Sequence, residues 1–186
     1  MIKNRKEYKY YVHCDEKVNI RGKHTPFYVG DEIKKYLKIV RKRELIDGYK
    51  KKFPKFKYIF SLYGSLLKWR CHNLGVKLGF SIPINVVGKG LRIDHYGFVV
   101  INEHAKVGDF CSIYGDVTIG VKGNNNSTQA PIIGNNVTIG SGARILGNVT
   151  IPDGCVVGAN AVVVHDVSGK NKVVAGIPAR EIKDVS

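Results

Sequence analysis

Residues 133–163 read IGNNVT-IGSGAR-ILGNVT-IPDGCV-VGANAV-V, a succession of six-residue units that each begin with an aliphatic residue. The fifth residue of every complete unit is small or β-branched: Val137, Ala143, Val149, Cys155 and Ala161. Neither the period of a helix nor the alternation of an ordinary strand produces this double register. It is typical of a solenoid in which three units form one triangular coil, with the aliphatic residue pointing inward.

The same spacing occurs upstream, at Ile101, Val107, Ile113 and Ile119. A β-sandwich of short strands is the alternative, but it would need period-two alternation rather than a six-residue repeat. The two series are out of phase, because the interval from Ile119 to Ile133 exceeds two whole repeats. The intervening residues 121–131 (VKGNNNSTQAP) have the composition of turns, so we expect an extended loop there. The sequence thus predicts a mainly β protein, a left-handed parallel β-helix over residues 81–186.

Residues 1–80 lack the repeat and are expected to be a basic, mostly helical N-terminal region. Apolar residues at helical spacing predict a helix over residues 31–42. A second helix is predicted over residues 56–71, with Gly75 following its end. No segment has the apolar run of roughly 18–20 residues that a membrane span needs, or the pattern of a signal peptide, which favours a cytoplasmic protein.

The net charge of +15 is concentrated in the first third of the chain, where residues 1–70 hold 20 Lys and Arg against 7 Asp and Glu. Residues 50–57 (KKKFPKFK) mix bases with aromatic residues. This stretch is either a solvated basic loop or a docking face for an anionic membrane or substrate. Nucleic acid is disfavoured, because no recognition motif accompanies the charge. Four widely spaced cysteines without a CxxC pair favour neither a metal site nor a disulfide framework.

Residues 91–97 (LRIDHYG), 139–147 (IGSGARILG) and 175–180 (AGIPAR) resemble the serine acetyltransferase family of hexapeptide-repeat acyltransferases. The resemblance covers about residues 80–183. It is closer to the serine acetyltransferase-like branch found in capsule and exopolysaccharide synthesis, through Ser81-Ile82-Pro83-Ile84-Asn85 and His95-Tyr96-Gly97. The implied activity is acetyl transfer from acetyl-CoA to a hydroxyl, without a metal, in a homotrimer.

The resemblance places the general base at His95, an imidazole that takes the proton of the acceptor hydroxyl. Asp94 matches a position that contacts substrate, and Tyr96 or Asn85 are candidates for orienting His95. The residues implied for acetyl-CoA binding lie on the coils and near the C-terminus: Gly120, Val121, Lys122, Gly123, Ser141, Gly142, Ala143, Ala159, Asn160, Arg180 and Lys183.

Two positions depart from the family pattern and bear on the acceptor. Phe80 stands where the family has the aspartate that partners the base, and Ala130 stands where it has a second, serine-binding histidine. We therefore expect a sugar hydroxyl of a surface-polysaccharide precursor or glycan as acceptor. Serine O-acetylation for cysteine biosynthesis and a non-enzymatic β-helix scaffold are the alternatives.

Overall fold

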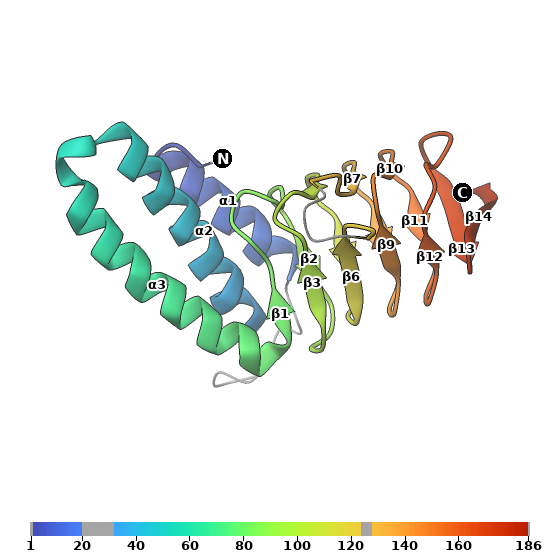
Figure 1. Ribbon diagram of the computed structural model, residues 1–186, viewed down its shortest axis with the longest axis horizontal. Helices are drawn as coiled ribbons and strands as arrows, with labels where there is room; N and C mark the ends of the chain where they lie inside the picture. Colours follow the sequence, from blue (N-terminus) through green and yellow to red (C-terminus); the bar gives the residue numbers. More distant parts are fainter. Residues whose placement is uncertain (1, 20–31, 124–127, 186) are drawn as a thin grey trace.

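The computed structural model describes residues 2–19, 32–123 and 128–185, with a helical region at one end and a parallel β-helix extending from it (Figure 1). The helices are α1 (Arg5–Val18), α2 (Glu32–Lys52), the short 3₁₀ helix η1 (Pro54–Phe56) and α3 (Lys57–Leu78). Helix α2 packs between α1 and α3. Within the described residues, no helix combines the length and apolar composition that crossing a bilayer requires.

Three parallel sheets form the faces of the β-helix. Sheet 1 contains β1 (Phe80–Ser81), β3 (Val99–Ile101), β6 (Val117–Gly120), β9 (Arg144–Leu146) and β12 (Val162–Val163). Sheet 2 contains β4 (Lys106–Val107), β7 (Ile132–Ile133) and β10 (Thr150–Ile151). Sheet 3 contains β2 (Arg92–Ile93), β5 (Ser112–Ile113), β8 (Thr138–Ile139), β11 (Val156–Val157), β13 (Lys172–Gly176) and β14 (Ala179–Asp184). Strand β14 runs antiparallel to β13, whereas the other pairs of this sheet are parallel.

The register of the strands shows that one coil is three six-residue units. Ile133 pairs with Ile151, which begins the third unit after it, and the aliphatic and small positions of the repeat are both buried in the coil interior. Full burial of an aliphatic side chain of this size stabilises the fold by about 1.5–3 kcal/mol. The hydrophobic core is therefore a continuous column along the β-helix axis.

The coil that contains residues 121–131 is longer than the others. One coil runs from a residue to its partner on the next strand of the same sheet. The coil from Val107 to Ile133 is more than one six-residue repeat longer than the coil from Ile133 to Ile151. The sequence alone suggests a shorter insertion, since it treats Ile119 and Ile133 as two repeats apart. In the structure Ile119 lies in sheet 1 and Ile133 in the next face, sheet 2, so they are only one repeat apart. The insertion falls between β6 and β7, and residues 124–127 lie outside the described part of the chain.

The helices extend beyond the ranges predicted from the sequence. Helix α2 continues to Lys52, so the basic stretch 50–57 is a helix end followed by η1 and not a loop. Helix α3 passes through Gly75 and ends at Leu78, where Gly79 caps it in a left-handed conformation with φ 78°. A side chain at Gly75 would place its Cβ 2.6 Å from the carbonyl oxygen of Phe80, so glycine there allows helix and strand to pack closely.

A buried charged cluster joins the helices to the β-helix. The guanidinium of Arg41, which is fully buried, donates from Nε to Asp15 Oδ2 over 2.8 Å and lies 3.2 Å from Glu44 Oε2. It also donates to the carbonyl oxygens of Val87 and Gly88 in the first coil. Because these partners come from both regions, the helical region and the β-helix pack as one body at this point.

Candidate functional site

His95 lies on a bend that connects β2 in sheet 3 to β3 in sheet 1. The bend is held at both ends, since the N–H of Asp94 donates to the carbonyl of Ile113 over 3.0 Å and that of Gly97 donates to Leu78 over 3.1 Å. The residue itself is exposed. The imidazole is therefore carried by a fixed backbone and faces solvent in a single chain.

Two glycines allow this bend to lie against the end of α3. Gly97 has φ 121° and Gly79 has φ 78°, conformations that residues with a side chain rarely adopt. A Cβ on Gly79 would lie 2.9 Å from the carbonyl carbon of Gly97. The position of His95 thus depends on contact between the helical region and the first coil.

Asp94, next to His95, has one carboxylate oxygen with a partner and one without. Its Oδ1 accepts from Arg92, at 3.0 Å from Nε and 2.8 Å from Nη2. Its Oδ2 is buried and has no hydrogen-bond partner within the described residues. Because an unpartnered buried carboxylate oxygen is costly, this atom is well suited to accept a hydrogen bond from a bound cationic or hydroxyl group.

The contacts recorded for the two residues considered for orienting His95 lead away from it. The hydroxyl of Tyr96 donates to Glu32 Oε2 over 3.2 Å, toward the helical region. Asn85 lies on the turn that follows sheet 1, a different corner of the coil, and its N–H donates to Glu44 over 2.8 Å. Neither contact involves the imidazole.

The two positions that depart from the family pattern are buried and apolar. Phe80 packs edge-on against Tyr36, with ring centroids 5.4 Å apart, and Ala130 belongs to the hydrophobic core of the coil. These side chains offer no polar group to a substrate. Recognition of an acceptor must come from other residues around His95.

Five of the residues implied for acetyl-CoA binding belong to the same column of corners as His95. These corners connect sheet 3 to sheet 1 in successive coils, and their residues are Ser141, Gly142, Ala143, Ala159 and Asn160. The corners are joined by backbone hydrogen bonds, including Asn160 N–H to the carbonyl of Ser141 at 2.8 Å. Small side chains along this column leave the main chain open to an extended ligand.

The column also contains an ion pair, between Arg144 and Asp116, that is not among the residues predicted from the sequence. Arg144 Nη2 lies 3.0 Å from Asp116 Oδ1, and both residues are between the His95 corner and the Asn160 corner. The signal available in the sequence was an arginine within an otherwise nearly neutral stretch of repeat. Its guanidinium is a cation of the kind that pairs with phosphate groups.

Residues Gly120–Gly123 lie at the opposite edge of sheet 1. Gly120 accepts a hydrogen bond from the N–H of Gly147 over 2.9 Å, at the corner that leads to sheet 2. The width of sheet 1 therefore separates these residues from His95 within one chain.

The two C-terminal candidates lie on β14, the last strand of the described chain. Arg180 lines a hollow of about 290 Å³ together with His165 and Asp166. Lys183 is exposed and pairs with Val173 of β13. Both are at the far end of the β-helix from the His95 bend (Figure 1).

Comparison with known proteins identifies the repeat. Residues 130–165 match the family model described as bacterial transferase hexapeptide (six repeats). A serine acetyltransferase of Synechococcus elongatus is 46% identical over 96 residues, which are 52% of this chain and 39% of that protein. The enzyme of the same name from Staphylococcus xylosus is 43% identical over 97 residues, 52% of this chain and 44% of its own length. The chain thus spans less than half the length of these curated relatives.

Solved structures extend the similarity to the helical region. Serine acetyltransferase from Brucella abortus in complex with coenzyme A is 26% identical, with a TM-score of 0.72 over 98% of this chain and 70% of that one. Soybean serine acetyltransferase complexed with serine is 27% identical, with a TM-score of 0.71 over 94% and 69%. The predicted left-handed β-helix with a helical N-terminal region is confirmed.

Proposed function

Because residues 130–165 match the model of the bacterial transferase hexapeptide repeat, we propose that this chain is an O-acetyltransferase with acetyl-CoA as donor and L-serine as acceptor. The observation that carries the proposal is the exposed imidazole of His95 next to Asp94, whose buried Oδ2 has no hydrogen-bond partner in the part of the chain that the structure describes. A proton acceptor beside an anion suits a substrate that has a hydroxyl and an ammonium group.

The prediction of a sugar or glycan acceptor, and with it the capsule and exopolysaccharide branch, is wrong. The relatives at 43% and 46% identity and the solved structures described above are serine acetyltransferases. Phe80 and Ala130, which remove two polar groups, favoured a sugar acceptor. Asp94 keeps a carboxylate next to His95 all the same.

The reaction needs one proton transfer and no covalent intermediate on the protein. The neutral imidazole of His95 accepts the proton of the serine hydroxyl while the oxygen attacks the thioester carbonyl of acetyl-CoA. The new C–O bond forms, the C–S bond breaks, and the proton passes from the imidazolium to the departing thiolate of coenzyme A. The carboxylate of Asp94 would accept a hydrogen bond from the substrate ammonium and so hold the hydroxyl near the base.

Acetyl-CoA fits the column of small residues that runs from His95 toward Asn160. Its pantetheine arm would follow the exposed backbone of Ser141 and Gly142, and the Arg144 guanidinium would meet a phosphate. The groups at Gly120–Gly123 lie across sheet 1, so we propose that a neighbouring chain supplies them in a homotrimer. Arg180 and Lys183 would be further cationic contacts at the distal end.

The test is thiol release from acetyl-CoA with and without L-serine, followed by mass spectrometry of the product. We expect serine-dependent thiol release that falls by about 10²–10⁴-fold in His95→Asn. His104→Asn, at an exposed histidine of the next turn, is the matched control and should leave the rate unchanged. Thiol release that is independent of serine, or unaffected by His95→Asn, would refute the proposal.

A further inference from the structure

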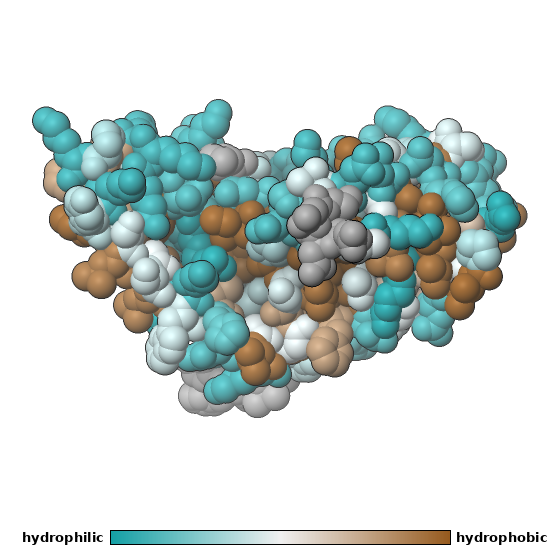
Figure 2. Space-filling model, viewed as in Figure 1, coloured by the Kyte–Doolittle hydropathy of each residue, from teal (hydrophilic) through white to brown (hydrophobic). Residues whose placement is uncertain are grey.

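Helix α3 exposes a stripe of large apolar side chains on the face away from α2. The members share one side of the helix at mostly three- and four-residue spacing: Tyr58, Ile59, Leu62, Leu66, Trp69 and Val76. Leu62 is 78% exposed and Trp69 62%. Figure 2 shows apolar side chains along the outer edge of the molecule where α3 lies in Figure 1. Contiguous exposed apolar surface of this kind marks an interaction site.

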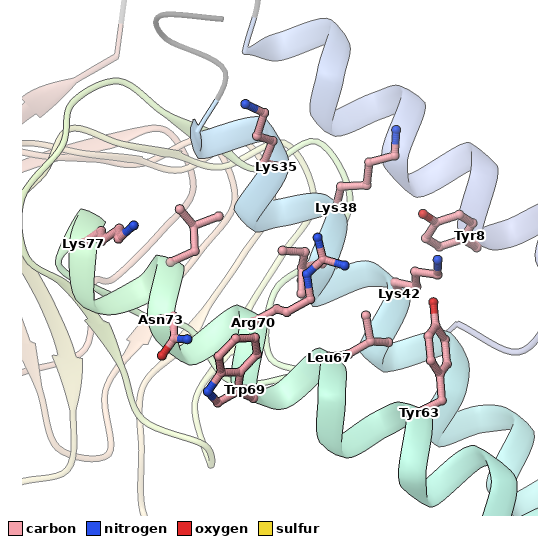
Figure 3. A pocket seen from close by; sticks show the side chains of 12 residues that line it. Tyr8, Lys35, Lys38, Lys42, Tyr63, Leu67, Trp69, Arg70, Asn73 and Lys77 are labelled. Carbon is pink, nitrogen blue, oxygen red and sulfur yellow. The ribbon is translucent and has the colours of Figure 1, made fainter.

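A cationic groove runs beside this stripe, between α2 and α3. It has a volume of about 530 Å³ and is lined by five basic side chains, Lys35, Lys38, Lys42, Arg70 and Lys77, and by no carboxylate among its described lining residues. Figure 3 shows the three lysines of α2 and Arg70 of α3 around the groove, with Trp69 of α3 among the side chains that line it. Lys38 also lies 3.6 Å from Glu16 Oε1 of α1, a solvent-exposed contact that leaves the groove strongly cationic.

The basic end of the helical hairpin extends the same pattern. Lys50, Lys51 and Lys52 are the last residues of α2, and the exposed ring of Phe53 precedes η1, which ends with the exposed ring of Phe56. The sequence had already marked this stretch as a candidate docking face. In the structure it adjoins the start of α3, so bases and aromatic residues continue from the hairpin tip to the groove.

We propose that the α3 stripe and the adjacent cationic groove dock on the surface of a bilayer that contains anionic lipid. The apolar side chains enter the boundary between headgroups and acyl chains, with the helix lying in the plane of the membrane. The lysines and Arg70 meet lipid phosphates at the headgroup level, where long basic side chains place their charges. The stripe and the groove contain none of the residues assigned to the proposed reaction, so the inference does not depend on it.

Charge decides between a bilayer and a second copy of the chain. A symmetric pair formed through this face would bring together two grooves of five cations each. Like charges at such an interface are unfavourable, whereas an anionic leaflet complements them. The aliphatic and aromatic stripe alone would fit either partner, but the groove fits only the anionic one.

Trp69 makes the proposal directly measurable, because it is the only tryptophan in the chain. We expect its fluorescence to shift to shorter wavelength on addition of phosphatidylcholine vesicles that contain phosphatidylserine. Brominated acyl chains should quench it. Neutral phosphatidylcholine vesicles should produce little change, and about 500 mM salt should reverse the shift, since surface charges are then screened.

Two pairs of variants separate charge from apolar insertion. Lys38→Gln with Lys42→Gln should weaken binding to anionic vesicles by about 25-fold, or about fivefold for each lysine removed. Lys106→Gln with Lys170→Gln, at exposed bases of the β-helix, is the control and should bind as the parent does. Leu62→Glu should abolish the Trp69 shift, whereas Ile182→Glu, at a side chain 61% exposed on β14, should not.

Three results would overturn the inference. The first is Trp69 emission that anionic vesicles leave unchanged at low salt, and the second is loss of binding in the control variants as strong as that in the groove variants. A shift that grows with protein concentration in the absence of vesicles would assign the stripe to self-association. Folding of each variant is checked by circular dichroism, so that loss of binding is compared only among folded proteins.

Discussion

Replacing Arg41 by methionine should destabilise the protein by about 3–5 kcal/mol, the effect of removing one partner from a buried ion pair. The side chain is fully buried, and Asp15 and Glu44 around it are 3% and 2% exposed. Without the guanidinium, two buried carboxylates lose their cation, and the carbonyls of Val87 and Gly88 lose a donor. The methionine fills much of the volume, so the loss reports charge and hydrogen bonding rather than a cavity.

The measurement is urea unfolding followed by circular dichroism, at several pH values. In the variant the two carboxylates are buried without a cation, and burial penalises their charged form most where both are ionised. The destabilisation should therefore be greatest at pH 7 and smaller at pH 5. Arg41→Lys keeps a charge but cannot reach all four acceptors, and its effect should be intermediate. A difference below about 1 kcal/mol at pH 7, or one that is constant with pH, would contradict the expected cost of leaving buried carboxylates unpaired.

Three further predictions concern the β-helix. Gly142→Ala should lower the melting temperature, because φ is 76° there and the new Cβ would lie 2.0 Å from Asn160 Oδ1. Burial raises the pKa of the Cys111 thiol to about 11, so we expect mass spectrometry to show alkylation at pH 8 only after unfolding. The N–H and hydroxyl of Ser168 lower the pKa of Glu181 below its usual 4.5. This contact therefore stabilises the fold above that value and is lost as the pH falls through the lowered pKa, which NMR titration of the carboxyl in the parent and in Ser168→Ala would show.

The acceptor was the least predictable part of the candidate site. The positions of Phe80 and Ala130 could be read from the sequence, and they favoured a sugar. What the sequence could not show was the state of Asp94, whose Oδ1 is taken by Arg92 while Oδ2 stays buried without a partner among the described residues. Which carboxylate oxygen of Asp94 has a partner depends on how the side chains pack, and the spacing of residues in the sequence does not show this.

The helix ends were predicted less well than the coils because tertiary contacts decide them. A glycine near the end of a helical pattern usually marks its end, and Gly75 was interpreted in that way. In the structure it is an interior residue that lets α3 approach the carbonyl of Phe80, and the helix continues to Leu78. Glycine is needed at position 75 because of the contact with Phe80 in β1, which cannot be predicted from the pattern of apolar residues in the helix.

By itself, the sequence determined the β-helix. Each six-residue unit packs its aliphatic residue against the same position three units along the chain, so the repeated pattern is enough to predict the contacts. Only the tertiary structure decided how the helical region is attached. Asp15 and Leu91 are 76 residues apart, and no local pattern links a helix carboxylate to that backbone N–H. A repeat is encoded by neighbours in the chain, whereas a buried polar cluster is satisfied only once distant segments have met.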